Sequence, residues 1–272
     1  MAKETKILII TEGDKDEILM NRLKELYIPD STSLYCYHTN IYDLYQRLEQ
    51  ELDGDFTDMD VLLTLKSYER RKGNADGEII KILEATYSDI LLIFDFDPQD
   101  HQYSADKLRT LMEVFNNSTE NGQLYLSYPM IESFLHLKLA NKSDGMLDEQ
   151  FLRATFSAEE LAGHRYKKRA NQEGMNLHIK QASKMQLDQI IYHHLYKMMN
   201  ILDGDTSYGN IMEWRRVARD SSIKELFENE HSLFEKTKHG DVISTCWHFI
   251  EESYPASLFT TMDAMTAYET DK

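Results

Sequence analysis

The chain has 272 residues, of which 42% are hydrophobic and 11% aromatic, enough to bury a sizeable core. Its formal net charge of −17 disfavours a protein that coats nucleic acid by bulk attraction to phosphate. The apolar runs are far too short to cross a bilayer, and the opening MAKETK lacks the apolar core of a signal peptide. We therefore expect a folded cytoplasmic protein with no membrane partner.

The first half of the sequence alternates short apolar runs with amphipathic segments. Residues 6–11 are a β-branched run typical of a buried parallel strand, and helical spacing of apolar residues follows from Asp14 up to Pro29. The later predicted elements are a strand at 33–39, a helix at 41–52, two helices within 57–86, a strand at 89–97, a helix at 105–117, a strand at 123–129 and a helix at 130–140. Within 57–86 the run VLLTL also fits a strand. This alternation predicts an α/β fold with a parallel sheet flanked by helices.

Beyond about residue 145 the pattern changes to helical periodicity with no convincing strand. The predicted helices cover residues 186–202, 213–229, 232–238 and 241–253. We interpret residues 1–145 as an α/β domain with a helical insertion at about 57–86. Residues 146–272 are predicted to form an α-helical region packed on that domain.

Acidic residues follow two of the predicted strands. Glu12 ends the first strand, and Asp95 and Asp97 end the strand at 89–97. Functional groups gather at the carboxyl ends of strands in open parallel sheets. Side chains alternate along a strand, so Asp95 and Asp97 are expected on one side and Phe96 on the other.

Buried acids without basic partners lose hydration and repel one another, and a divalent cation relieves both costs. Mg²⁺ and Mn²⁺ prefer oxygen ligands. The pattern therefore predicts a site for Mg²⁺ or Mn²⁺ at Glu12, Asp95 and Asp97. A single acid at a strand end more often caps a turn or a helix, but here three acids follow two apolar strands of one α/β unit.

The segment LIITEGDKDE (8–17), followed some eighty residues later by LIFDFD (92–97), resembles the TOPRIM domain of topoisomerases, primases and OLD-family nucleases. In that family a Glu ends the first strand, often in an EGxxD/E context, and a DxD follows a later strand. The resemblance covers roughly residues 5–140. It implies that Glu12, Asp95 and Asp97 are catalytic metal ligands and that Gly13 lets the backbone turn closely beside the site.

The segment LSYPMIESF (126–134) resembles a strand-Pro-helix element in stand-alone TOPRIM-like proteins of bacterial defence systems, which implies Glu132 as a fourth acidic metal ligand. The gap between Glu12 and Asp95 is longer than the minimal motif requires. No topoisomerase tyrosine, primase zinc-binding region or GxxxxGKS/T phosphate loop can be assigned. The resemblance thus implies a stand-alone protein, with any ATPase or other defence protein as a separate partner.

Charge is segregated along the chain. Residues 49–60 carry six acids and no base, whereas residues 164–184 carry six Lys or Arg and one Glu. The candidate nucleic-acid contacts are Arg165, Lys167, Lys168 and Arg169, with a smaller group at Arg70, Arg71 and Lys72. Tyr166 or His164 would stack on a base. A solvated helix face explains the same basic pattern equally well.

The leading hypothesis is a Mg²⁺- or Mn²⁺-dependent nuclease acting on DNA or RNA, with a possible use in defence against phage. A haloacid-dehalogenase-type phosphatase is disfavoured, because Gln99 stands where Thr or Val is expected and the strand is not the first. The remaining alternative is a non-catalytic sensor or acidic interaction module that binds a partner protein through residues 49–60. The two cysteines, Cys36 and Cys246, lack CxxC spacing and are interpreted as reduced and structural.

Overall fold

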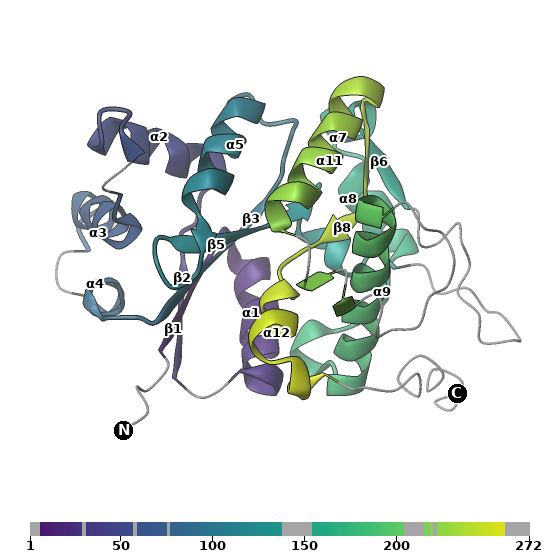
Figure 1. Ribbon diagram of the computed structural model, residues 1–272, viewed down its shortest axis with the longest axis horizontal. Coiled ribbons are helices and arrows are strands. Elements are labelled where there is room, and N and C mark those ends of the chain that lie inside the picture. Colours follow the sequence, from purple (N-terminus) through teal and green to yellow (C-terminus); the bar gives the residue numbers. More distant parts are fainter. Residues whose placement is uncertain are drawn as a thin grey trace, which may run out of the picture.

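A six-stranded mixed sheet lies at the centre of the molecule, with helices on both sides (Figure 1). The computed structural model describes residues 6–28, 31–56, 59–74, 77–137, 154–203, 215–216, 218–219 and 222–258. The strands of this sheet are β1 (Ile7–Thr11), β2 (Thr32–Cys36), β3 (Asp89–Asp95), β4 (Asn116–Asn117), β5 (Gly122–Tyr128) and β8 (Ile243–Ser244). The predicted α/β class, with a mostly parallel sheet flanked by helices, is confirmed.

The sheet order explains where a site can form. Strands β2, β1, β3 and β5 run parallel in that order, and β4 closes the path. The chain moves from β1 to β2 on one side and then crosses back to β3 on the other side. The carboxyl ends of β1 and β3 therefore flank a topological switch point, where parallel sheets open a crevice.

The central strands are apolar because both of their faces are covered. Every residue of β1 is buried, which is the burial expected of a parallel strand between two helical layers. Helix α1 (Asp14–Tyr27) lies on one side of the sheet, while α2 (Ile41–Glu51) and α5 (Ala105–Val114) lie on the other (Figure 1).

The two helices predicted within residues 57–86 are confirmed. They are α3 (Val61–Arg71) and α4 (Glu78–Glu84), so VLLTL is helical. Asp60 decides this locally, because its carboxylate accepts a hydrogen bond from the backbone N–H of Leu63 at 3.0 Å and caps the helix.

The prediction of no strands after residue 145 is wrong. Strands β6 (Thr155–Ser157) and β7 (His239–Asp241) form an antiparallel pair, and β8 joins the outer edge of β5. Each has only two or three residues, too few for a periodicity signal. The helix predicted at 241–253 is reduced to α12 (His248–Ser253), which follows β8 and the bend after it.

The helix predicted at 130–140 is also wrong over its described part, which forms a short 3₁₀ turn, η2 (Ile131–Phe134). The carbonyl of Phe134 lies 3.2 Å from a ring nitrogen of His194, and the carbonyl of Leu135 accepts from the N–H of Met175 at 2.7 Å. Tertiary partners thus occupy the carbonyls that a continuing α-helix would use. Residues 138–140 lie outside the described ranges.

The second half of the chain adds α7 (Ala158–Ala162), α8 (Tyr166–Glu173), η3 (Ile179–Gln181), α9 (Lys184–Asp203), α11 (Ile223–Thr237) and η4 (Pro255–Ser257). The predicted break within α11 is absent. Apolar side chains of this half join those of the sheet in one hydrophobic core, and the predicted boundary at residue 145 lies outside the described residues. Among the described helices, none is both long and apolar enough to span a bilayer.

Candidate active site

Glu12 and Asp95 meet across the switch point. The backbone N–H of Glu12 extends the strand pairing by donating to the carbonyl of Ile93 at 3.1 Å. In return, the N–H of Asp95 donates to Glu12 Oε2 at 2.9 Å. The end of β3 therefore holds the Glu12 carboxylate beside Asp95.

Asp97 reaches the same place by a different route from the one predicted. Strand β3 ends at Asp95, and Asp97 lies beyond it with a left-handed φ of 39°. Its N–H donates to the carbonyl of Pro129 at 3.0 Å, and Gln99 Nε2 donates to its Oδ1 at 2.7 Å. A turn, not strand alternation, directs this side chain.

Glu12, Asp95 and Asp97 form what we call the carboxylate cluster, with one oxygen from each lying within 4.8 Å of the others. Burial and mutual repulsion raise the pKa of Glu12 and of Asp95 well above the usual range. Burial and neighbouring carboxylates raise the pKa of Asp97 to about 6. Asp95 Oδ1 is buried and accepts no hydrogen bond from the described residues. Crowded oxygens with an unused buried acceptor fit a Mg²⁺ or Mn²⁺ ion.

Asp16 was not predicted, although it occupies the last position of the EGxxD pattern. It lies in the first turn of α1, is 3% exposed, and lines the same pocket as the carboxylate cluster. Burial raises its pKa to about 7, and Glu132 and Asp97 add repulsion. Its Oδ1 is another buried oxygen with no partner among the described residues. The pocket therefore holds a fourth candidate oxygen ligand.

Glu132 lies in the pocket but outside the carboxylate cluster. Its side chain is 7% exposed, and Oε1 pairs with Lys15 Nζ at 2.6 Å and with Lys167 Nζ at 3.4 Å. Lys15 was not predicted. Glu132 therefore holds two lysines beside the carboxylate cluster. Its role as a metal ligand stays a prediction.

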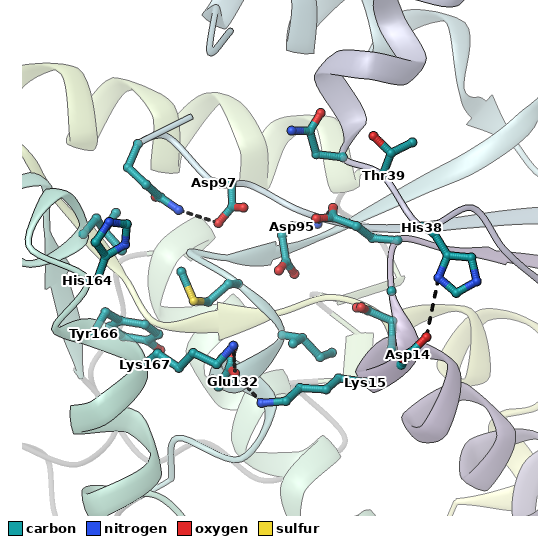
Figure 2. Close-up of a pocket in the computed structure, with 18 residues that line it drawn as sticks. Asp14, Lys15, His38, Thr39, Asp95, Asp97, Glu132, His164, Tyr166 and Lys167 are labelled. Carbon is teal, nitrogen blue, oxygen red and sulfur yellow. Dashed lines mark hydrogen bonds and ion pairs between the residues drawn. The ribbon is translucent and has the colours of Figure 1, made fainter. Parts of the chain in front are cut away.

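The pocket is a cavity of about 650 Å³ at the carboxyl ends of β1 and β3. Figure 2 shows Asp95 and Asp97 near its middle, between His38 with Asp14 on one side and His164, Tyr166 and Lys167 on the other. Lys15 and Lys167 reach toward Glu132 from opposite directions. Acids and lysines thus face one solvent-accessible space.

The basic residues predicted around α8 have different surroundings. Lys167 lines the pocket, and Lys168 is exposed. Arg165 pairs with Glu159 at 2.8 Å on the surface. Arg169 is engaged in the fold, because it binds Glu160 and Glu173 and donates to the carbonyl of Thr155. Of these four residues, only Lys167 lines the pocket.

Arg70 and Arg71 end α3 and do not line the pocket. They pair with Glu84 at 3.1 Å and Glu51 at 2.8 Å, and Figure 1 places α3 at the opposite end of the molecule from α8. The structure does not bring this second basic group to the carboxylate cluster. Lys72, of the same group, lies over the ring of Tyr68.

Two further interpretations are corrected. Tyr166 cannot stack on a base, because its side chain is buried and its hydroxyl lies 3.1 Å from His136 Nδ1, whereas His164 is exposed at the pocket. Gly13 has an extended backbone that any residue adopts, and an added Cβ would lie an ordinary 3.8 Å from Asp16 Oδ2. The turn therefore does not require glycine.

Comparisons of the chain with protein-family models, curated proteins and solved structures found no match.

Proposed function

We propose that the protein is a metal-dependent nuclease of the TOPRIM type that hydrolyses phosphodiester bonds with Mg²⁺ or Mn²⁺. The observation that carries the proposal is the carboxylate cluster: three acids from two adjacent strand ends share one space, and Asp95 Oδ1 has no hydrogen-bond partner among the described residues. Such crowding is costly unless a cation joins it.

Glu12, Asp95 and Asp97 would hold the ion, with Asp16 beside them. A bound divalent cation polarises a phosphate and lowers the pKa of water. Asp16, which is outside the three ligands and has a pKa of about 7 in the metal-free pocket, is suited to hold and release a proton near neutral pH. The site thus combines charge neutralisation with proton transfer.

A phosphate is the ligand that best fits the rest of the pocket. Lys15 and Lys167 are 55% and 58% exposed at their side chains, so solvent and ligands reach them, and both meet at Glu132. An entering phosphodiester would take over hydrogen bonds from these ammonium groups and lie between them and the acids. Lys168 extends the positive surface along α8 for a flanking phosphate.

The proposal extends to a role in defence, because the segments LIITEGDKDE and LIFDFD resemble those of TOPRIM nucleases and LSYPMIESF resembles stand-alone defence proteins. Nucleic acid of a phage or of the host is then the substrate, and an ATPase or another defence protein is a candidate partner. The alternative of a non-catalytic acidic module would hold if metal bound and no phosphodiester were cleaved.

The test is incubation of the purified protein with Mg²⁺ or Mn²⁺ and a panel of duplex DNA, single-stranded DNA, total RNA and tRNA. Glu12→Gln and Asp95→Asn are expected to lower turnover by about a hundredfold or more, the scale of losing electrostatic stabilisation of a transition state. Nucleic-acid binding should persist in both variants.

Asp106→Asn is the matched control. Asp106 lies on α5 with its side chain 93% exposed, so this variant makes the same change of charge outside the pocket. Its activity should equal that of the wild type. Full cleavage by Glu12→Gln and Asp95→Asn would overturn the proposal.

A further inference from the structure

A second group of candidate ligands lies at the end of β2, beside the carboxylate cluster. It consists of Asp14, Cys36 and His38, and we call it the mixed-ligand cluster. One ligand atom from each residue lies within 4.8 Å of the others. Neither the fold nor the proposed nuclease activity accounts for a thiol, an imidazole and a carboxylate gathered in this way.

The backbone explains how the three residues meet. Cys36 ends β2, and the N–H of Tyr37 continues the pairing by donating to the carbonyl of Thr11 at 2.8 Å. His38 lies beyond the strand with a left-handed φ of 58°, so a turn after the fully buried Tyr37, and not strand alternation, brings its ring beside Cys36. Asp14 begins α1 at the neighbouring strand end, and Figure 2 shows it joined to His38 at the pocket rim.

The spacing fits a tetrahedral zinc ion. His38 Nδ1 lies 3.4 Å from Cys36 Sγ and 3.5 Å from Asp14 Oδ1. With ordinary zinc bond lengths, a tetrahedral centre separates sulfur from nitrogen by about 3.5 Å and nitrogen from oxygen by about 3.4 Å. The two distances from His38 Nδ1 therefore match the ligand-to-ligand separations of a tetrahedral zinc site.

We propose that Asp14, Cys36 and His38 form a binding site for Zn²⁺ or a chemically similar transition-metal ion, separate from the carboxylate cluster. Thiolate and imidazole ligands select such ions over Mg²⁺, which prefers oxygen. On binding, the S–H bond of Cys36 breaks, its proton leaves to solvent, and a sulfur–metal bond forms.

The ion would have three protein ligands and a solvent-facing fourth position. The side chains of His38 and Asp14 are 58% and 82% exposed, and both residues line the pocket, so water or a pocket ligand can complete the coordination. A cation at this rim would add positive charge at the entrance to an acidic pocket. The site and its test do not depend on the proposed nuclease activity.

The test is titration of the full chain with Co²⁺, whose bond to a thiolate gives a charge-transfer absorption, followed by displacement with Zn²⁺. The wild type is expected to develop the band and to lose it when Zn²⁺ is added. Cys36→Ser should abolish the band, and His38→Gln should weaken Co²⁺ binding by about tenfold or more. No thiolate band in the wild type would overturn the proposal.

Two controls separate the sites. Asp95→Asn removes a carboxylate-cluster ligand and should keep the full Co²⁺ band, whether or not the protein cleaves nucleic acid. The other cysteine, Cys246, is fully buried. A band that persists in Cys36→Ser would come from a thiolate other than Cys36 and would contradict the assignment.

Alkylation of Cys36, followed by mass spectrometry, gives a second readout. Zn²⁺ should slow this alkylation about tenfold in the wild type and not in His38→Gln. Equal alkylation of the wild type with and without Zn²⁺ would also overturn the proposal.

Discussion

The carboxylate cluster and the mixed-ligand cluster lie side by side at neighbouring strand ends, yet different forces shape them. The first contains three partly buried acids whose pKa values are raised by burial and repulsion. The second contains one acid, one thiol and one imidazole with two exposed side chains. Electrostatic strain therefore marks the first cluster, whereas ligand type and spacing mark the second.

Crowded acids and soft ligands thus predict a metal for separate reasons. In the carboxylate cluster an ion would remove a cost that the fold already carries, so metal binding and stability should be linked. In the mixed-ligand cluster His38 and Cys36 already contact each other at 3.4 Å, so the metal-free fold carries little electrostatic cost there.

The first expected effect is on metal binding at the carboxylate cluster. Mn²⁺ should stabilise the wild type by about 2.7 kcal/mol at a concentration 100 times its Kd, and Asp95→Asn combined with Asp97→Asn should abolish this gain. Thermal unfolding with and without Mn²⁺ measures it. Cys36→Ser should retain the full gain, and an equal loss in that variant would mean that the two clusters bind one ion together.

The second effect is on the stability of the metal-free protein, which Asp97 is expected to lower as the pH rises. The native pKa of Asp97 is about 6, above the ordinary 3.8, so the native protein holds more protons than the unfolded chain between about pH 4 and pH 6. Asp97 therefore costs metal-free stability as pH rises through this window. Asp97→Asn, which tolerates the left-handed φ, removes that cost.

Urea denaturation in the presence of a chelator measures the difference between Asp97→Asn and the wild type. It should be near zero at pH 4 and reach up to about 3 kcal/mol in favour of the variant at pH 7.5. A difference that is constant from pH 4 to pH 7.5 would show that Asp97 is not under electrostatic strain.

The third effect distinguishes the two roles considered for Glu132. Glu132→Gln keeps the shape of the side chain but weakens its hold on Lys15 and Lys167. If Glu132 only positions lysines, nucleic-acid affinity should fall about three- to tenfold while the Mn²⁺ stabilisation stays unchanged. Loss of that stabilisation would favour the ligand role implied by the sequence resemblance.

The smallest effect concerns the basic surface. Replacing Lys167 and Lys168 by Gln should weaken nucleic-acid binding severalfold and reduce the salt slope by about 0.7 to 0.9 for each phosphate that the variant no longer neutralises. Fluorescence anisotropy over a range of salt concentrations measures both. Arg70→Gln with Arg71→Gln is the matched control, since these residues lie away from the pocket; an equal loss of affinity there would point to bulk charge.

The sequence was most informative where burial is strongest. Apolar runs predicted β1, β3 and β5, because strands covered on both faces are continuously hydrophobic. Glu12 and Asp95 could be placed at one edge of the sheet because parallel strands present their carboxyl ends together. Asp97 was predicted to reach the same edge by strand alternation. In the structure a turn places it there, and that turn depends on Pro129, thirty-two positions later.

Other features required tertiary information. Strands β6, β7 and β8 are too short for a pattern, and pairing with distant segments creates them. Glu132 was recognised, but its two lysines come from α1 and α8, and no local spacing brings those helices together. The EGxxD pattern could have identified Asp16 as a candidate, but it does not show that Asp16 is buried.

The two short antiparallel strands beside β5 also determine how the chain can be divided. β4 pairs with the start of this strand and β8 with its end, and Thr245 exchanges hydrogen bonds with Leu126 between them. A truncated chain that stops before β8 would leave part of this edge unpaired, and an open edge is a template for aggregation between copies. The solubility of the N-terminal half is therefore expected to depend on residues 119 positions away in the sequence.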